Sequence, residues 1–432
     1  MSKFNRSKRV FRREPHPELF PESLESKAGP LVVGLRRLCE EVAGERLRQM
    51  YQPHGGVAYD PVGMFCVLIF GLMRNTSSSR ELEDRVRYDV RFQYLMRGQT
   101  PDHTTISRFR QLVAGVVEDI FTDVLKKART EGLVSAKNVA VDGTKIEANT
   151  AQWRRNLQKA DAQEAEVHTD TDPDARPMRQ RKGGAIIRGY NAQVAVDMEG
   201  DGLILASHVS SQANDAAEMG TVVENLKATQ VQPEAIVADA GYDSAPNHQA
   251  LKDASVTSFV SPRAHHDEFW QVGEDGKICC PAGHTPVKAR QTVLDGVVYD
   301  SFEVRACPRC PLKTVCGVRK VKTISVRTDY DVALRVANAH RSQTEEGQAK
   351  RRRRSATVER LFGHMKSNRG LRRFKLRGLP GVLCEFRLHC LSYNLERLLR
   401  ACFWLIRRLF GPQTGRLLLL FIRNELRPAS ST

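Results

Sequence analysis

The pattern of apolar and polar residues divides the chain into a helical first part and a later part with strands. Apolar side chains fill the stretch 61–73, and apolar positions recur at helical spacing over much of residues 31–135. One helix start is indicated by Asp102 or Thr104, either of which is a suitable N-cap. Residues 31–135 are therefore predicted to form a helical domain that follows a basic arm over residues 1–30. It is either a DNA-binding domain, with Arg108 and Arg110 placed to contact the DNA backbone, or a plain helical bundle with solvated arginines.

From about residue 137 the pattern changes to short apolar or alternating runs that are typical of strands. The expected elements are strands at 139–141, 190–197 and 203–209, a helix at 215–228, and strands at 235–238 and 256–260. Followed by a late helix, this is the element order of an RNase H-like fold, in which the first and fourth strands lie side by side. The predicted fold class is α/β, with an RNase H-like mixed sheet, an all-α N-terminal domain and a small Cys-rich insertion.

The same pattern sets the expected domain boundaries. Residues 136–262 are expected to form the first part of the RNase H-like core, and residues 263–350 an insertion. Residues 351–432 contain the late helix of the core and the C-terminal helices. Residues 151–185 are polar and charged and are expected to be a loop or a mobile insertion.

The net charge of the chain predicts a class of binding partner. The chain has 67 Lys and Arg against 50 Asp and Glu, a formal net charge of +17, so a polyanion is the expected partner and nucleic acid is the first choice. Residues 351–400 alone contain 14 Lys and Arg against 3 acids. Residues 1–13 of the arm contain six more cations without an acid, a pattern that is also compatible with a disordered solubilising tail: Lys3, Arg6, Lys8, Arg9, Arg12 and Arg13.

No segment has the pattern of a signal peptide, because the N-terminus lacks an apolar core after its charges. The apolar run 417–422 is far too short to cross a bilayer. We therefore expect a cytoplasmic protein without a membrane partner. In that compartment the ten cysteines are expected to be thiols or metal ligands rather than disulfides.

Three acidic residues are candidates for a metal-binding catalytic site. Asp142 and Asp239 each end a predicted strand, and Glu359 lies on the late basic helix. Each acid alone is better explained as a turn, cap or surface residue, but three carboxylates that converge can bind divalent metals for phosphodiester chemistry. Two further acids are expected to be structural: Asp215 as a helix cap and Asp243 as a turn residue.

Sequence blocks around the three acids resemble the signature blocks of the DDE transposases of bacterial insertion sequences. The blocks are Asp142-Gly-Thr, Ala-Asp239-Ala-Gly-Tyr-Asp-Ser and Val-Glu359-Arg-Leu-Phe-Gly-His-Met-Lys366. The resemblance covers about residues 30–400 and includes the helical segment 61–110. One departure concerns a tyrosine and an arginine that related families place before the glutamate, because Arg352 and Ser355 occupy those positions here.

The resemblance implies a metal-dependent DNA transposase, a polynucleotidyl transferase. Asp142, Asp239 and Glu359 would bind Mg²⁺ or Mn²⁺, and Lys366 would contact DNA at the transposon end. Hydrolysis at the 3′ end of the element would free a 3′-hydroxyl that attacks target DNA. The expected partner is double-stranded DNA, both transposon ends and target, and a homodimer is expected in the synaptic complex. The residues expected to contact DNA are Arg108, Arg110, Arg352, Arg354, Lys366 and Arg373.

A cysteine cluster lies in the predicted insertion. Cys307 and Cys310 are spaced like a zinc knuckle, and Cys280 with Cys316 could complete a tetrahedral site that binds a structural Zn²⁺. Cys279 and His284 are alternative ligands, and buried reduced thiols are the alternative reading. A site closed by four thiolates has no open position, so it would not be the catalytic metal centre.

Two other functions fit parts of the same pattern. A structure-specific nuclease on the same core would use the acids to cut DNA without joining it. A non-enzymatic zinc-ribbon regulator would bind DNA and would not need the acids.

Overall fold

The computed structural model describes residues 23–52, 56–150, 171–180, 184–263, 270–272, 277–294, 297–318, 320–327 and 332–410. Most of the basic arm, the apolar run 417–422 and residues 151–170 of the expected polar loop lie outside the described residues. None of the described helices has the length and hydropathy that a membrane span requires.

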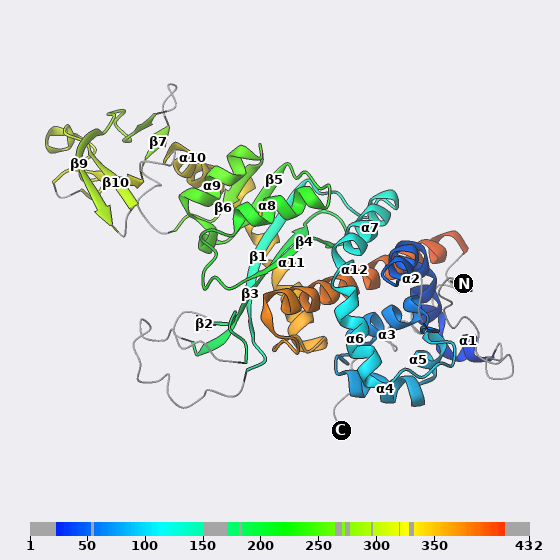
Figure 1. Cartoon of the computed structure of the whole chain (residues 1–432). Coiled ribbons are helices and arrows are strands. Elements are labelled where there is room, and N and C mark those ends of the chain that lie inside the picture. The colour runs from blue at the N-terminus through cyan, green and yellow to red at the C-terminus, as the bar shows by residue number, and fades with distance from the viewer. Residues whose placement is uncertain are drawn as a thin grey trace, which may run out of the picture.

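Helices make up the first part of the described chain, as predicted (Figure 1). They are α1 (Ser23–Ala28), α2 (Pro30–Gln49), α3 (Pro61–Met73), α4 (Ser79–Tyr88), α5 (Val90–Leu95), α6 (His103–Val113) and α7 (Val117–Thr130). The apolar helix α3 is buried along its whole length. Asp102 is the N-cap of α6, because its carboxylate accepts the backbone N–H of Thr105 at 2.7 Å.

A mixed six-stranded sheet forms the centre of the molecule and confirms the predicted α/β class. Its strands are β1 (Asn138–Glu147), β2 (Arg176–Arg179), β3 (Ile186–Asp197), β4 (Ile204–Ser210), β5 (Ala235–Ala238) and β6 (Thr257–Val260). The order is β2-β3-β1-β5-β6, with β4 on β3. The strands β1 and β2 are each antiparallel to β3, which lies between them, whereas β1, β5 and β6 are parallel to one another.

Helices cover both faces of this sheet. On one face, α11 (Glu345–Gly363) packs with Val358 against Ala140 and Val237 of the two central strands. On the other face, Val141 and Ile236 belong to the main core, which also contains residues of α8 (Met219–Ala228) and α12 (Gly378–Phe410). Successive side chains of a strand point to opposite faces of the sheet, so Ala140 and Val141 pack against different helices.

The long helix α12 joins the helical part to the sheet (Figure 1). The amide of Asn394 exchanges hydrogen bonds with the backbone of Ile204 on β4, and the Ser392 hydroxyl donates to the carbonyl of Ile69 on α3. Arg369 is buried against Ser392 and the carboxylate of Glu396. These polar contacts fix the position of α12 between the two parts of the chain.

The predicted insertion between β6 and α11 contains its own small sheets. Its elements are β7 (Gln271–Val272), β8 (Ile278–Cys279), β9 (Val287–Leu294), β10 (Val297–Glu303), β11 (Thr323–Arg327) and α10 (Val332–Gln343). A separate small core surrounds the fully buried Trp270. The helix α10 returns to the central sheet, where Asn338 exchanges two hydrogen bonds with the backbone of Val260 at the end of β6.

Candidate active site

Adjacent parallel strands bring Asp142 and Asp239 to the same place on the sheet. Ala140 on β1 is opposite Val237 on β5, and continuing this register by two residues places Asp142 opposite Asp239. Because side chains alternate along a strand, each aspartate lies on the face of its alanine or valine neighbour two residues earlier. That is the face covered by α11. The sheet therefore presents both carboxylates toward the helix that carries Glu359.

The two aspartates occupy different positions relative to their strands, and only Asp239 follows the end of its strand as expected. Asp239 directly follows β5 and caps a short 3₁₀ helix, η2 (Ala240–Tyr242), by accepting the N–H of Gly241 at 2.8 Å. Asp142 was expected to end its strand, but β1 continues to Glu147. The expectation was wrong because β3 goes on pairing with β1 beyond the point where β5 stops.

The Arg354 side chain from α11 lies between the two aspartates. Its Nη2 is 3.0 Å from Oδ1 of Asp142 and 4.0 Å from Oδ2 of Asp239, and its Nε donates to the carbonyl of Val141 at 3.2 Å. Burial raises the pKa of Asp142 to about 6, against the opposing effect of Arg354, and the charges of Asp239 and Asp215 raise it further. The pair is thus an acidic centre that needs a cation.

Glu359 and Lys366 lie on the same segment of chain as Arg354. Glu359 is exposed and accepts the hydroxyl of Ser355 at 2.6 Å, one residue after the buried Val358. Lys366 lies in a π-helical turn after α11, and its Nζ is 3.4 Å from the carbonyl of Lys145 on β1. Burial lowers the pKa of Lys366, whereas the nearby charge of Asp142 opposes that shift.

Asp215 joins the two aspartates, which the sequence did not predict. The expectation that it caps a helix was wrong, because α8 begins at Met219 with Glu218 as its N-cap. Its carboxylate instead accepts the side-chain amides of Asn191 at 2.8 Å and Gln193 at 2.6 Å, both on β3. The site therefore contains a further acid from a loop that precedes α8.

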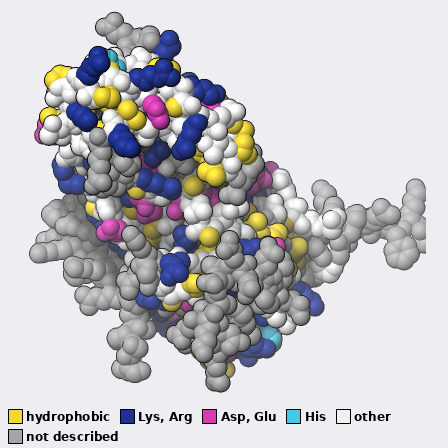
Figure 2. Space-filling model, turned by 90° about the vertical axis from the view of Figure 1, so that its left-hand side faces the viewer, with side chains coloured by type: hydrophobic (Ala, Val, Ile, Leu, Met, Phe, Trp, Pro, Cys, Tyr) yellow, Lys and Arg dark blue, Asp and Glu magenta, His cyan; other side chains and the backbone are white. Residues whose placement is uncertain are grey.

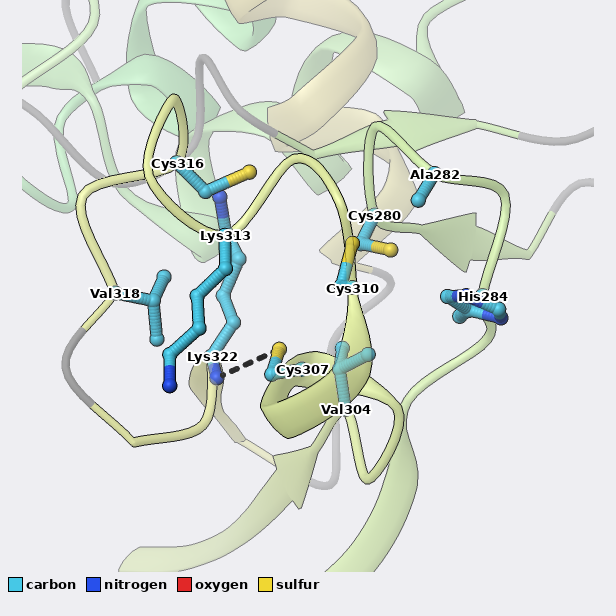
Figure 3. A pocket seen from close by; sticks show the side chains of 10 residues that line it. All are labelled: Cys280, Ala282, His284, Val304, Cys307, Cys310, Lys313, Cys316, Val318 and Lys322. Carbon is cyan, nitrogen blue, oxygen red and sulfur yellow. Dashed lines mark hydrogen bonds between the residues drawn. The ribbon is translucent and has the colours of Figure 1, made fainter.

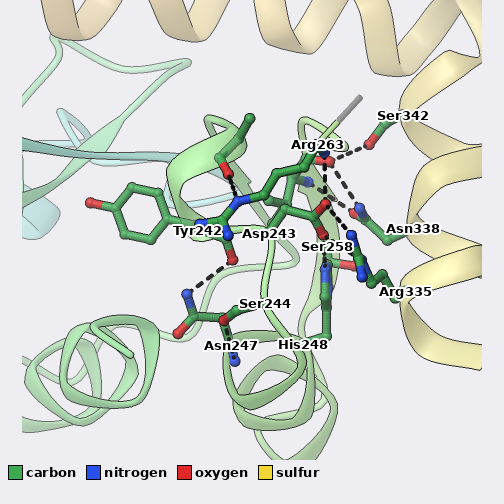
Figure 4. Close-up of polar contacts among 12 residues, drawn as sticks. Tyr242, Asp243, Ser244, Asn247, His248, Ser258, Arg263, Arg335, Asn338 and Ser342 are labelled. Atoms are coloured by element: carbon green, nitrogen blue, oxygen red, sulfur yellow. Dashed lines mark hydrogen bonds and ion pairs between the residues drawn. The ribbon is translucent and has the colours of Figure 1, made fainter. Parts of the chain in front are cut away.

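Asp243 was expected to be a turn residue, but it is the centre of a buried polar network (Figure 4). Its carboxylate is 2.8 Å from Nε2 of His248 and accepts the backbone N–H of Arg263 at 2.7 Å. Although burial alone would raise the pKa of Asp243, these hydrogen bonds and the nearby Arg335 hold it below its usual value. The Arg263 guanidinium donates to the carbonyls of Ala240 and Gly241. The loop that follows Asp239 is thus fixed to α10.

The arginines expected to bind DNA occupy different environments. Arg108 and Arg110 lie two residues apart on α6, so their side chains point in different directions. Arg108 is exposed, whereas Arg110 turns inward and donates to the carbonyl of Ser77 at 2.6 Å. Arg352 is exposed on α11, and Arg373 donates to the carbonyl of Ala148.

The insertion also presents basic residues to solvent. The side of the molecule shown in Figure 2 carries the insertion at the top, where many Lys and Arg side chains are visible above a band of Asp and Glu. Exposed members on the insertion include Arg290, Arg305, Arg309 and Lys320. A negatively charged polymer could therefore contact both the insertion and α11.

Four cysteines of the insertion line one pocket (Figure 3). They are Cys280, Cys307, Cys310 and Cys316, and His284 lies at the same pocket. The backbone N–H of Lys322 donates to the sulfur of Cys307 at 3.3 Å. Burial lowers the pKa of the Lys322 ammonium, against the opposing effect of Cys316, Cys280 and Cys307.

Comparison with protein families assigns the chain. A family model described as "Transposase domain (DUF772)" matches residues 25–112, which hold the helices before Val113. A second model, described as "Transposase DDE domain", matches residues 279–399, which include Glu359 and Lys366. The chain belongs to the DDE transposases of insertion elements. This membership makes the transposase a polynucleotidyl transferase with DNA as its partner. Asp142 and Asp239 precede the residues matched by the second model.

The acidic centre of the transposase fits a divalent metal by its chemistry. Carboxylate oxygens are the ligands that Mg²⁺ and Mn²⁺ prefer, and Asp142 and Asp239 already share the positive charge of Arg354. As the side chains stand in the described parts of the chain, no three His, Cys, Asp or Glu residues are close enough to hold one ion. Binding would thus require the side chains to move closer together.

Proposed function

We propose that this transposase cleaves the ends of its insertion element and joins the freed 3′-hydroxyl to target DNA at the site formed by Asp142, Asp239 and Glu359. The observation that supports this most is the parallel register of β1 and β5, which aims both aspartates at α11. Bound there, Mg²⁺ or Mn²⁺ would supply an activated attacking oxygen and a counter-charge for the leaving oxygen.

Each residue of the site would then have a separate role. Asp142 and Asp239 would hold the metal from a rigid sheet, and Glu359 would complete the site from α11. Lys366 lies beside β1 on the Asp142 side and would contact a phosphate of the transposon end. Arg354 would keep the aspartates in place before the metal binds, because it is buried and paired with both.

The remaining parts of the chain would hold and align DNA. We assign the helical domain 31–135 and the basic surface around α11 to binding, with Arg108 and Arg352 as exposed candidates. A homodimer would synapse two ends. Analytical ultracentrifugation of the protein with end DNA tests this, since a complex with one protein copy per pair of ends would refute the dimer.

A strand-joining assay with labelled element ends tests the proposed reaction. The Asp142→Asn and Asp239→Asn variants should bind end DNA, yet fail to cleave the 3′ end or join it to target. Lys366→Ala should mainly weaken DNA binding and reduce its dependence on salt, because one phosphate contact is lost. Full cleavage and joining by Asp142→Asn would show that the catalytic assignment is wrong.

The same assay separates two other functions. A structure-specific nuclease would release cut ends and leave the target intact in every reaction. A DNA-binding regulator would show neither product, and its binding would be unchanged in the aspartate variants.

We further propose that the pocket in the insertion binds one structural Zn²⁺ through Cys280, Cys307, Cys310 and Cys316. The four cysteines line one pocket, with Cys307 and Cys310 on the same turn, and a backbone N–H already donates to the Cys307 sulfur. Their sulfurs would have to come closer together than they stand in the described chain to share one ion. Lys322 would offset part of the negative charge of four thiolates. The insertion has a small core, so a metal would supply much of its folding free energy.

Metal analysis of the purified transposase tests the zinc proposal. We expect one zinc per chain in the wild type, and loss of that zinc in Cys307→Ser and Cys310→Ser. Cys279→Ser is the matched control, because Cys279 is adjacent to Cys280 but does not line the pocket. His284→Ala tests the alternative ligand and should keep its zinc. Wild-type protein without zinc and with all four thiols freely reactive would refute the site.

A further inference from the structure

The Asp215 carboxylate lies in the gap between the backbones that follow the two catalytic aspartates. A Cβ built on Gly143 would be 2.8 Å from Oδ1 of Asp215, and one built on Gly241 would be 3.1 Å from Oδ2. Gly143 directly follows Asp142, and Gly241 is two residues after Asp239. The carboxylate therefore lies against the backbone beside both aspartates, and the two glycines leave the room that it occupies.

The surrounding residues fix Asp215 from three directions. The amides of Asn191 and Gln193 both donate to Oδ1, and the hydroxyl of the buried Tyr242 donates to the Gln193 carbonyl oxygen. The Asn247 amide donates to the backbone carbonyl of Asp215 at 3.0 Å. Side chain and backbone are thus both held, which is the arrangement of a residue whose position matters to its neighbours.

The hydrogen bonds do not account for the charge of Asp215. Both amides use Oδ1, and no ion pair to Asp215 occurs among the described residues, while Arg354 is already paired with the other two acids. Placing this carboxylate near Asp142 and Asp239 adds repulsion to the folded protein. A purely structural residue would perform the same hydrogen bonding as a neutral side chain.

A second observation also indicates a missing cation or donor at this point. The Oδ1 atom of Asn191 is buried without a hydrogen-bond partner, and it would be 3.0 Å from a Cβ on Gly143. An unpaired buried oxygen is costly, so natural proteins seldom keep one without a function. Beside Asp215, this oxygen extends the row of acceptors at the site.

We propose that Asp215 is a fourth acidic residue of the catalytic centre, which binds divalent metal through its free Oδ2 together with Asp142 and Asp239 when these side chains move closer than they stand among the described residues. This inference rests on the proposed function of the site and assigns it a further metal-holding residue. Asn191 and Gln193 orient the carboxylate toward the metal. The glycines at positions 143 and 241 keep the approach open.

Mn²⁺ binding and thermal melting of the full-length protein test this role. Asp215→Asn keeps Oδ1 as an acceptor for both amides, removes the charge and replaces Oδ2 by an amide nitrogen that cannot bind a metal. We expect its affinity for Mn²⁺, measured by isothermal titration calorimetry, to fall roughly 10–100-fold, the range seen when groups that support metal ligands are lost. Without metal, its melting temperature should not fall, since repulsion is relieved. Asp84→Asn, an exposed carboxylate on α4, is the control and should match the wild type in both measurements.

The outcomes separate this inference from the proposed function. If Asp142→Asn weakens Mn²⁺ binding and Asp215→Asn does not, the site stands and Asp215 has no metal-holding role. A lower melting temperature of metal-free Asp215→Asn with unchanged Mn²⁺ affinity would make the residue structural and overturn the proposal. If neither variant affects Mn²⁺ binding, the catalytic assignment itself fails.

Discussion

Replacing Arg354 by methionine removes the cation that the two central aspartates share and keeps a long side chain. The Arg354 side chain is 11% exposed and that of Asp142 is 20% exposed, so the ion pair is largely shielded from water. Removing one partner of a buried ion pair costs about 3–5 kcal/mol. Because Asp142 retains some contact with water, we expect the lower end, about 3 kcal/mol, in metal-free protein.

Thermal melting with and without Mn²⁺ measures this effect. A change of 1 kcal/mol shifts the melting temperature of a unit of 150–250 residues by roughly 2–4 °C, so the expected decrease is at least about 6 °C. Mn²⁺ should raise the melting temperature of the variant more than that of the wild type, because the ion no longer competes with the guanidinium. Arg353→Met is the matched control, since Arg353 is exposed on the same helix. The reasoning is refuted if both variants melt alike and respond equally to Mn²⁺.

Three further outcomes follow from the structure. His389 is buried with a pKa lowered to about 3, mainly by burial, so only the unfolded state gains its proton as the pH falls below about 6.5. This residue should therefore lower the free energy of unfolding by about 2 kcal/mol between pH 8 and pH 5, a dependence that His389→Gln should lack in denaturation measured at both pH values. Gly143→Ala would place a Cβ 2.4 Å from a neighbouring amide nitrogen and should cost about 1–3 kcal/mol, whereas Gly220→Ala on α8 meets nothing within 4 Å and should stabilise the protein by up to about 1 kcal/mol in the same denaturation experiment. Asp243→Asn leaves the buried His248 without its charged partner, so the melting temperature should fall by an amount that corresponds to about 3 kcal/mol; an unchanged value would show that the network does not hold the loop.

Local pattern was sufficient to predict the elements that carry the candidate site. The apolar run 235–238 is a buried strand, and the acid that follows it is where the pattern placed it. The end of β1 could not be predicted, because residues after Asp142 are polar and remain in the strand only through β3. Pairing with residues 189–193, far along the chain, decides where the strand ends, and the local sequence pattern does not contain that information.

Which side chains meet at the candidate site depends on the fold as well as on the local sequence. Arg354 precedes the buried Val358 by four residues and Leu361 by seven, so it lies on the same stripe of α11, and this spacing is the signal that could have identified it. Asp215 offers no such signal, since it lies in a loop and its position depends on side chains from β3 and α9 (Ala245–Asp253). Sequence reasoning finds residues on regular elements more readily than residues on loops.

Strand joining by a Glu359→Gln variant tests the central assignment most directly, because Glu359 is the acid whose side chain is exposed and must move to complete the site. The assay uses labelled element ends, target DNA and Mg²⁺, with Glu346→Gln on the same helix as the control. We predict that Glu359→Gln binds the ends but loses cleavage and joining by on the order of 10³-fold, since several kcal/mol of metal-based stabilisation disappear. Joining at the rate of the control variant would contradict a catalytic centre built from Asp142, Asp239 and Glu359.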